Sequence, residues 1–242
     1  AAQKLTKASR PTKQYGTLLP TREIVIWANG GDVLSQDGTK CLLDQPAADE
    51  AIQFLSDLRF KYQVAPLQSD MTGTSPTDLF LSGRVAMDID LSAQVSTFER
   101  SKPKFAWDID RVPKGKVTRA TIVQGPSVGI IQAAKHRDLT WDWVSWLTGQ
   151  EIQAYEATVA HMAMARKSAG VAFLKLPPPP QHRAEIIDSV PFARQLEYVQ
   201  NFIQIDDVTN KHLDDVLVSN SKTAQAAMQA ACQQITPLLG KG

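Results

Sequence analysis

The chain has 242 residues, of which 43% are hydrophobic and 21% are charged, a composition ordinary for a globular protein with a core of its own. Its 26 Lys and Arg residues balance 25 Asp and Glu residues, so the formal net charge is +1. This balance, with basic residues scattered along the chain, argues against nucleic acid or an anionic membrane as the partner. The uncharged window 120–134 is too short and too interrupted to span a bilayer.

Apolar periodicity and turn residues predict the elements of the first half. The clearest is a helix at 45–61, which has Pro46 in its first turn and apolar residues at helical spacing. In chain order we expect a helix end at 1–7, a strand at 15–19, the helix at 45–61, a short helix from 74 to 81, a strand at 85–90 and a helix at 92–100.

The second half continues the alternation of short strands and helices. We expect strands at 105–109, 121–123 and 128–131, helices at 138–147, 149–157, 185–202 (broken near Pro191), 206–217 and 223–239, a loop at 161–167 and an extended proline run at 177–180. Together the elements predict an α/β architecture with a mostly parallel sheet.

One stretch, residues 27–32, places an aromatic ring, an amide, two glycines and a carboxylate within six residues. A flat apolar ring beside hydrogen-bonding groups suits a polyhydroxylated ligand. The alternative is a structural Trp27 at the end of a helix that the two glycines terminate. The residues alone leave both interpretations open.

Motifs for phosphate binding, metal binding and nucleophilic catalysis are absent from the sequence, so no cofactor, no metal and no catalytic residue are expected. Asp88 and Asp90 would share one face of a strand, either as a carboxylate pair of a glycan-active enzyme or as a hydrogen-bonding or capping pair. The four histidines (His136, His161, His182 and His212) lie among polar neighbours and are expected at the surface.

The two cysteines, Cys41 and Cys232, are separated by 191 positions and match no metal-binding spacing. The sequence leaves open whether they form a disulfide or remain two separate thiols. Residues 1–13 are polar and basic and lack the apolar core of a signal peptide, so the sequence leaves open both a cytoplasmic protein and a chain that starts after processing or truncation.

Several landmarks, taken in order, resemble the sugar-type family 1 extracellular solute-binding proteins of bacterial ABC importers, the group that includes maltose-binding protein. The family patterns are W-x-N-G-G, F-x-x-G-K-x-A-M, M-P-x-G, a glycine-rich segment, W-x-F-L-x-S-x-E and P-x-R-x-S. Their counterparts here are residues 27–32, 79–87, 113–115, 124–130, 141–151 and 164–168. The resemblance covers nearly the whole chain.

The resemblance implies a periplasmic-binding-protein-like fold of type II with an intact second lobe and only part of the first. Residues 1–112 and 166–242 would form the second, C-terminal lobe, and 113–165 the remnant of the first, N-terminal lobe. Family members are typically longer, and roughly the first third of their chain has no counterpart here. Leu91 and Ser92 stand where the family often has glycine followed closely by tryptophan, so one sugar-stacking platform is expected to be missing.

In such proteins two lobes close on a ligand, and loops at the carboxyl ends of strands supply the contacts. By resemblance, the ligand-binding residues would be Trp27, Asn29, Asp32, Asp90, Ser92, Gly125, Ser127 and Arg166. The alternatives are a simple turn at Gly125 and a lobe-to-lobe ion pair at Arg166. Trp141, Trp143 and Trp146 are expected to pack or lie on the lobe surface rather than stack on a sugar.

The resulting hypothesis is a carbohydrate-binding component of an ABC sugar importer, working with its membrane subunits and performing no chemistry. The resemblance implies a periplasmic or extracellular location, from a precursor that could be membrane-tethered. A second hypothesis is a shortened relative that acts as a protein-interaction module, whose partner is the missing N-terminal segment or a second copy. A third is a glycan-active enzyme using Asp32, Asp88 or Asp90.

Overall fold

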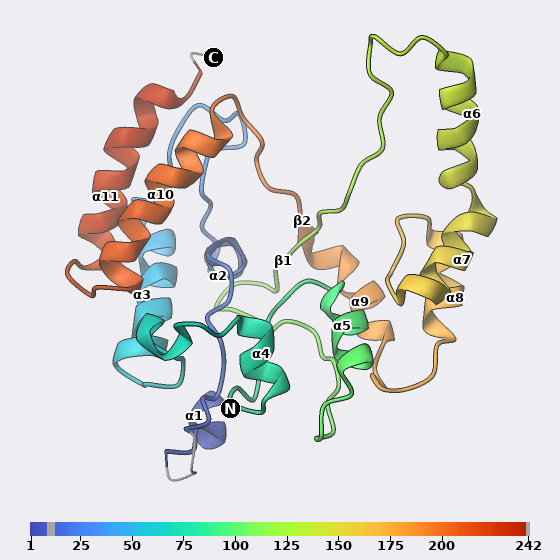
Figure 1. Cartoon of the computed structure of the whole chain (residues 1–242). Coiled ribbons are helices and arrows are strands. Elements are labelled where there is room, and N and C mark those ends of the chain that lie inside the picture. Colours follow the sequence, from blue (N-terminus) through green and yellow to red (C-terminus); the bar gives the residue numbers. More distant parts are fainter. Residues whose placement is uncertain (9–12, 241–242) are drawn as a thin grey trace. The chain divides into compact units, whose positions relative to one another are not determined.

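The computed structural model describes residues 1–8 and 13–240 (Figure 1). Its α-helices are α1 (Ala2–Leu5), α2 (Arg22–Ala28), α3 (Pro46–Phe60), α4 (Pro76–Leu81), α5 (Gln94–Ser101), α6 (Arg137–Leu147), α7 (Gln150–Ala160), α8 (Gly170–Leu174), α9 (Ala184–Asp188), α10 (Phe202–Leu217) and α11 (Ala224–Ile235). Short 3-10 turns occur at Gln68–Met71, Lys167–Ala169, Val190–Phe192 and Thr236–Leu238, and the strands are β1 (Thr121–Ile122) and β2 (Ala193–Arg194).

Residue contacts divide the chain into two compact units. Unit 1 comprises Ala1–Ile89, Val112–Ile122 and Phe192–Gly242, and unit 2 comprises Asp90–Arg111 and Val123–Pro191. These bounds differ from those of the expected lobes, whose assignment rests on the family resemblance and stays a prediction. Residues 9–12 and 241–242 of the expected second lobe lie outside the described residues.

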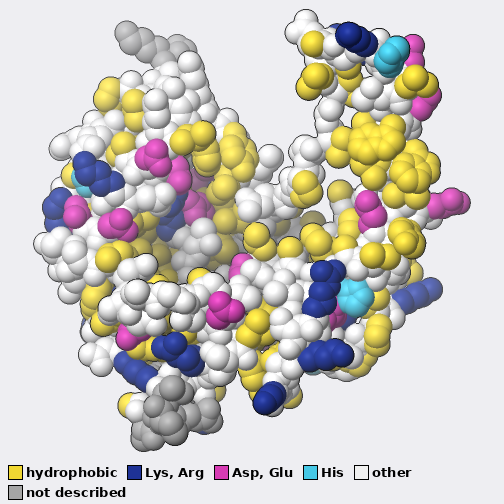
Figure 2. Space-filling view, in the orientation of Figure 1, with side chains coloured by type: hydrophobic (Ala, Val, Ile, Leu, Met, Phe, Trp, Pro, Cys, Tyr) yellow, Lys and Arg dark blue, Asp and Glu magenta, His cyan; other side chains and the backbone are white. Residues whose placement is uncertain are grey.

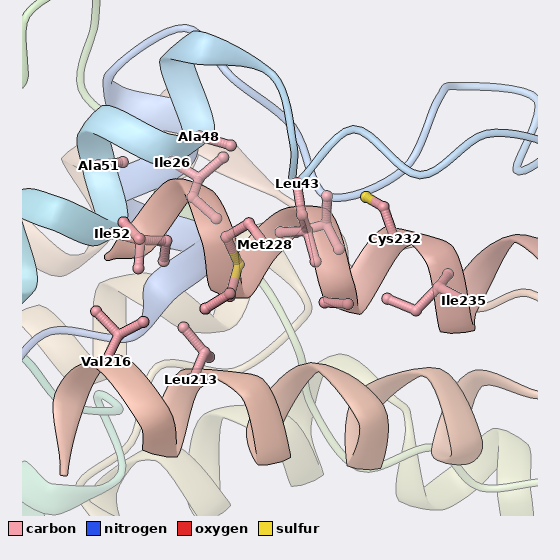
Figure 3. Close-up of a cluster of buried hydrophobic side chains, with 14 of the residues drawn as sticks. Ile26, Leu43, Ala48, Ala51, Ile52, Leu213, Val216, Met228, Cys232 and Ile235 are labelled. Carbon is pink, nitrogen blue, oxygen red and sulfur yellow. The ribbon is translucent and has the colours of Figure 1, made fainter. Parts of the chain in front are cut away.

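The main core of unit 1 lies between helices α3, α10 and α11, which pack side by side (Figure 1). Helix α3 begins at Pro46 and buries Ala48, Ala51, Ile52 and Leu55, the three-and-four spacing of one helix face. Helix α11 contributes a stripe of small and apolar side chains around the fully buried Met228 (Figure 3). The predicted helices of this core are thus confirmed.

A disulfide joins Cys41 to Cys232, with Cα atoms 5.4 Å apart. It ties the segment before α3 to the last turn of α11, where Cys232 lies in the buried cluster (Figure 3). The sequence left this pairing open, because the two residues meet only once the helices have packed.

Strand pairing is sparser than expected. Strands β1 and β2 pair in parallel, with Thr121 opposite Ala193 and Ile122 opposite Arg194. The expected strands near Tyr15 and Val85 meet in a single parallel bridge, extended by a bond from the Leu18 amide to the Met87 carbonyl at 3.1 Å. Among the described residues, no β-ladder is longer than the two-residue pairing of β1 with β2.

Besides the expected strands at 15–19 and 85–90, which form only a single bridge, three sequence predictions of regular structure are wrong. Residues 105–109 and 128–131 form no strand in the described chain, and in the second segment Val128 and Ile131 are 48% and 72% exposed instead of packed in a sheet. The helix expected over 185–202 stops at Asp188, because Pro191 cannot donate a backbone bond and the next residues pair with β1 as β2.

Unit 2 is built from short helices. Helix α7 packs against α6 and α8, and Ala157, Ala169 and Phe173 are fully buried there. Among the residues that the structure describes, no helix combines the length and the hydropathy needed to cross a bilayer.

The expectation that all four histidines lie at the surface is wrong for His212. This residue of α10 is only 5% exposed, and its Nε2 atom lies 3.0 Å from Nε2 of Gln234. Its position on the inner face of an amphipathic helix, rather than its polar sequence neighbours, decides its burial.

Candidate functional site

The stretch 27–32 is the end of helix α2 and the turn after it. Asn29 caps the helix, and Gly30 follows with a φ of +86°, a left-handed conformation that ends helices and that glycine adopts without strain. A Cβ on Gly31 would lie 3.0 Å from the Ala48 nitrogen of α3. The two glycines therefore terminate one helix and let another approach, as the structural alternative for this stretch predicted.

Trp27 lies at the centre of a polar cluster in unit 1. Its indole is 2% exposed, and its Nε1 atom donates to Oδ1 of Asp32 at 2.9 Å. Arg194 lies over the ring, with its guanidinium carbon 4.5 Å from the ring centroid, and donates to Oδ2 of Asp32 at 2.7 Å. The same guanidinium nitrogen reaches Glu197 at 3.2 Å. The indole face is thus covered by a cation that two carboxylates hold.

The cluster shifts the pKa of Glu197. Burial raises the pKa of Glu197 above its ordinary value, and the nearby carboxylate of Asp32 raises it further. Arg194 acts in the opposite direction, but its effect is smaller. Two carboxylates, Asp32 and Glu197, therefore share one guanidinium.

Asn29 belongs to a neighbouring group. Its side-chain amide donates to the Ala47 carbonyl at 2.8 Å and to Glu50 at 3.1 Å. Lys116 approaches the same carboxylate at 2.9 Å, and these bonds lower the pKa of Glu50. The amide thus joins the end of α2 to the first turns of α3.

A comparison with known protein families shows the family of the chain. The model of the bacterial extracellular solute-binding protein family matches residues 1–154, more than half of the sequence. The chain belongs to this family.

Solved structures of solute-binding proteins share its fold. An ABC substrate-binding protein of Listeria monocytogenes, in complex with cycloalternan, has a TM-score of 0.82 at 21% identity and matches 98% of this chain. An ABC transporter solute-binding protein of Thermotoga lettingae, bound with alpha-D-tagatose, has a TM-score of 0.79 at 20% identity and matches 99% of this chain. The maltose/maltodextrin-binding domain of Bdellovibrio bacteriovorus, bound to maltotriose, has a TM-score of 0.73 at 19% identity and matches 97% of this chain. The expected periplasmic-binding-protein-like fold of type II is confirmed.

The chain spans 61%, 63% and 64% of the lengths of these three solute-binding proteins. It therefore holds part of the fold that they share, as the truncated form expected from the sequence predicts.

Within this family member, the ligand residues expected from the sequence divide between the two units. Trp27, Asn29 and Asp32 belong to unit 1, where Trp27 and Asp32 are bonded to each other. The remaining five belong to unit 2: Asp90, Ser92, Gly125, Ser127 and Arg166.

The five residues of unit 2 are exposed. The Asp90 carboxylate accepts a bond from the Leu91 amide at 2.7 Å, and Arg166 donates from Nε to the Thr148 carbonyl at 2.9 Å. A Cβ on Gly125 would meet no atom within 4 Å. No hydrogen bond or ion pair among the described residues joins these five to one another, so their role as a ligand site stays a prediction.

Sequence reasoning missed Arg194 and Glu197. They lie 162 and 165 positions after Asp32, in a segment that was expected to be helical. The pattern F-A-R-Q-L-E, with its acid three positions after the arginine, was the available signal, but it does not indicate that the arginine covers a distant tryptophan.

Proposed function

We propose that this chain is the ligand-capturing component of an ABC importer for a sugar or oligosaccharide, and that it acts by binding alone. The observation that carries the proposal is the similarity of nearly the whole chain to solved solute-binding proteins bound to cycloalternan, alpha-D-tagatose and maltotriose. Membership of the extracellular solute-binding family supports it. The proposed location is periplasmic or extracellular, from a membrane-tethered precursor, and the proposed partners are the importer's membrane subunits.

The proposed binding mode is closure of two lobes on the ligand at the cleft between them, a hinge motion that the membrane subunits read. The lobes are assigned as residues 1–112 with 166–242, and residues 113–165. The ligand would contact Trp27, Asn29, Asp32, Asp90, Ser92, Gly125, Ser127 and Arg166.

The geometry around Trp27 adds a condition to this proposal. Since Arg194 covers the indole face, Trp27 can stack on a sugar ring only after the guanidinium moves aside. With Arg194 in place, Trp27 would act through Asp32, by fixing the orientation of its carboxylate. Asp32 and Arg194 would then be the groups in this cluster that meet ligand hydroxyls.

Titration calorimetry with maltotriose and with tagatose tests the proposed residues. Asp90→Ala and Arg166→Ala should each weaken binding by about fivefold to tenfold, the ordinary effect of losing one hydrogen bond. Lys211→Ala, at an exposed position of α10, is the matched charge-removal control and should leave the affinity unchanged. Equal affinities for all four proteins would remove Asp90 and Arg166 from the site.

A second function, a protein-interaction module completed by a missing N-terminal segment or a second copy, is favoured by the surface of helices α6 and α7. Hydrophobic side chains gather on it (Figure 2). Trp141, Trp143 and Trp146 of α6 are 62%, 53% and 59% exposed, and Tyr155 of α7 is 65% exposed. The sequence predicted that the three tryptophans either pack within a lobe or lie on its surface, and these values agree with the second alternative. Isolated exposed apolar residues are common, but several large exposed rings on two adjacent helices favour an interface.

Sedimentation velocity over a range of protein concentrations tests this second function. Self-association that disappears in a Trp141→Gln, Trp143→Gln, Trp146→Gln triple variant would support it. A monomer at all concentrations, with no binding to a peptide chain corresponding to the N-terminal part of a longer relative, would contradict it.

A further inference from the structure

Unit 2 contains a pocket that none of the proposed ligand residues lines. Its volume is about 580 Å³, within the range of small-molecule sites. The wall is formed mainly by aromatic rings and prolines, and three polar side chains, Glu99, Lys102 and His161, interrupt it. Because all its residues lie within unit 2, the pocket is complete without unit 1.

The pocket arises from the way helix α5 ends. Lys102 adopts a left-handed conformation, with φ of +47°, and stops the helix. The chain then turns back at Pro103, so that Trp107 meets Phe98 of the same helix edge-on, with centroids 5.5 Å apart and planes at 82°. This contact fixes the indole, and Trp107 remains partly exposed on the pocket wall.

An ion network joins the prolines that line the pocket to helix α5. The Arg183 side chain is 4% exposed and donates to Glu99 at 2.5 Å and to the carbonyl oxygens of Pro177 and Pro179 at 3.0 and 3.3 Å. It therefore ties the proline wall to α5. His161, which ends α7 in a left-handed conformation, contacts the other Glu99 oxygen through Nδ1. Its Nε2 is then the ring nitrogen that can bond a ligand.

The charges of the wall limit the class of ligand. Glu99 is neutralised by Arg183, so a cation gains little from it. A plain hydrocarbon would bury Glu99, His161 and Lys102 without bonding them, which is costly. A ring with an apolar face and hydroxyls at its edge satisfies both the indole and the polar groups.

We propose that this pocket binds a pyranose-like polyol ring, stacked on Trp107 and hydrogen-bonded by Glu99, His161 and Lys102. The site lies apart from the residues proposed for the importer ligand and does not depend on that function.

Nuclear magnetic resonance of the indole N–H groups of the whole chain tests the proposal, with maltose as the probe. The five tryptophans give one signal each and are assigned by single Trp→Phe variants. The Trp107 signal should shift as maltose is added, and the shift should level off once the site is saturated. His161→Gln and Lys102→Met should each weaken this response by about fivefold, the effect of one lost hydrogen bond. Trp143→Phe, on exposed α6, is the matched control and should leave the response unchanged.

The outcomes separate this site from the importer site. A Trp107 signal that stays unmoved by maltose overturns the inference, whether or not the Trp27 signal moves. A Trp107 signal that moves with phenol but not with maltose also overturns it, because the pocket would then be an apolar site. A saturable shift at Trp107 in an Asp90→Ala, Arg166→Ala chain supports a second, independent site.

Discussion

Arg194 covers the indole of Trp27 and at the same time bonds to Asp32, which accepts the indole N–H. One guanidinium thus lies over the ring whose exposure a stacking site would need. Residues 162 positions apart make the contact between Asp32 and Arg194, and the pairing of β1 with β2 places Arg194 there.

Arg194→Ala should uncover Trp27. The substitution removes a half-exposed ion pair and a cation–π contact, each worth up to about 1 kcal/mol at such sites. We expect the free energy of unfolding to fall by about 1 kcal/mol and acrylamide to quench Trp27 fluorescence more strongly. The background is a chain in which the other tryptophans are phenylalanine. Arg166→Ala, which removes an exposed guanidinium, is the control; equal quenching in both variants would contradict the covering role.

Stability should fall with rising pH because of Glu197. Its pKa is raised in the folded protein, so between the ordinary value of 4.5 and the folded value the native state binds more protons than the unfolded state. The free energy of unfolding therefore decreases as the pH rises through that interval. Glu197→Gln should remove this dependence. The difference in free energy of unfolding between wild type and variant should therefore change as the pH rises from 4. A difference that stays constant from pH 4 to 7 by urea unfolding would contradict the raised pKa.

The Cys41–Cys232 disulfide should contribute strongly to stability. It closes a loop over a sequence separation of 191, and restricting the unfolded chain over such a length is worth about 3 to 5 kcal/mol. The Cys41→Ala, Cys232→Ala double variant should unfold at correspondingly lower denaturant, and dithiothreitol should destabilise wild type but not the variant. A loss below about 1 kcal/mol would show that packing alone holds α11 in place.

Two glycines of the family motifs, Gly115 and Gly125, should differ in how well they tolerate substitution by alanine. A Cβ on Gly115 would lie 2.5 Å from the Ala28 carbonyl oxygen, whereas one on Gly125 would meet nothing within 4 Å. Gly115→Ala should cost about 2 kcal/mol or more, and Gly125→Ala should stay within about 0.5 kcal/mol. Chemical denaturation checks both. If Gly125→Ala weakens sugar binding at unchanged stability, the proposed ligand role of Gly125 gains support.

The sequence predicted the helices of the core well because their stability comes from local periodicity and caps. Helix α3 has its buried stripe and its Pro46, and α11 has Thr223, whose hydroxyl accepts a bond from the Ala226 amide at 3.2 Å. The strands were overpredicted, since a β-ladder needs a partner that no local pattern supplies. Segment 128–131 is apolar enough for a strand but has no neighbour to pair with among the described residues.

The candidate site was predictable only in part. The turn at 27–32 follows from a short motif, but the bond between Trp27 and Asp32 inside it was not predicted. Arg194, Glu197 and the pairing of Cys41 with Cys232 depend on contacts between distant segments, which no spacing in the sequence encodes. The burial of His212 likewise follows from the face of α10 that it occupies.

The most direct test of the central claim is thermal unfolding of the purified chain against a panel of mono-, di- and oligosaccharides. A sugar at about 100 times its dissociation constant should add about 2.7 kcal/mol to the free energy of unfolding and raise the midpoint clearly. A rise with one class of sugar is the predicted result and would identify the ligand class. A cooperative transition whose midpoint no sugar changes would contradict carbohydrate binding by this chain.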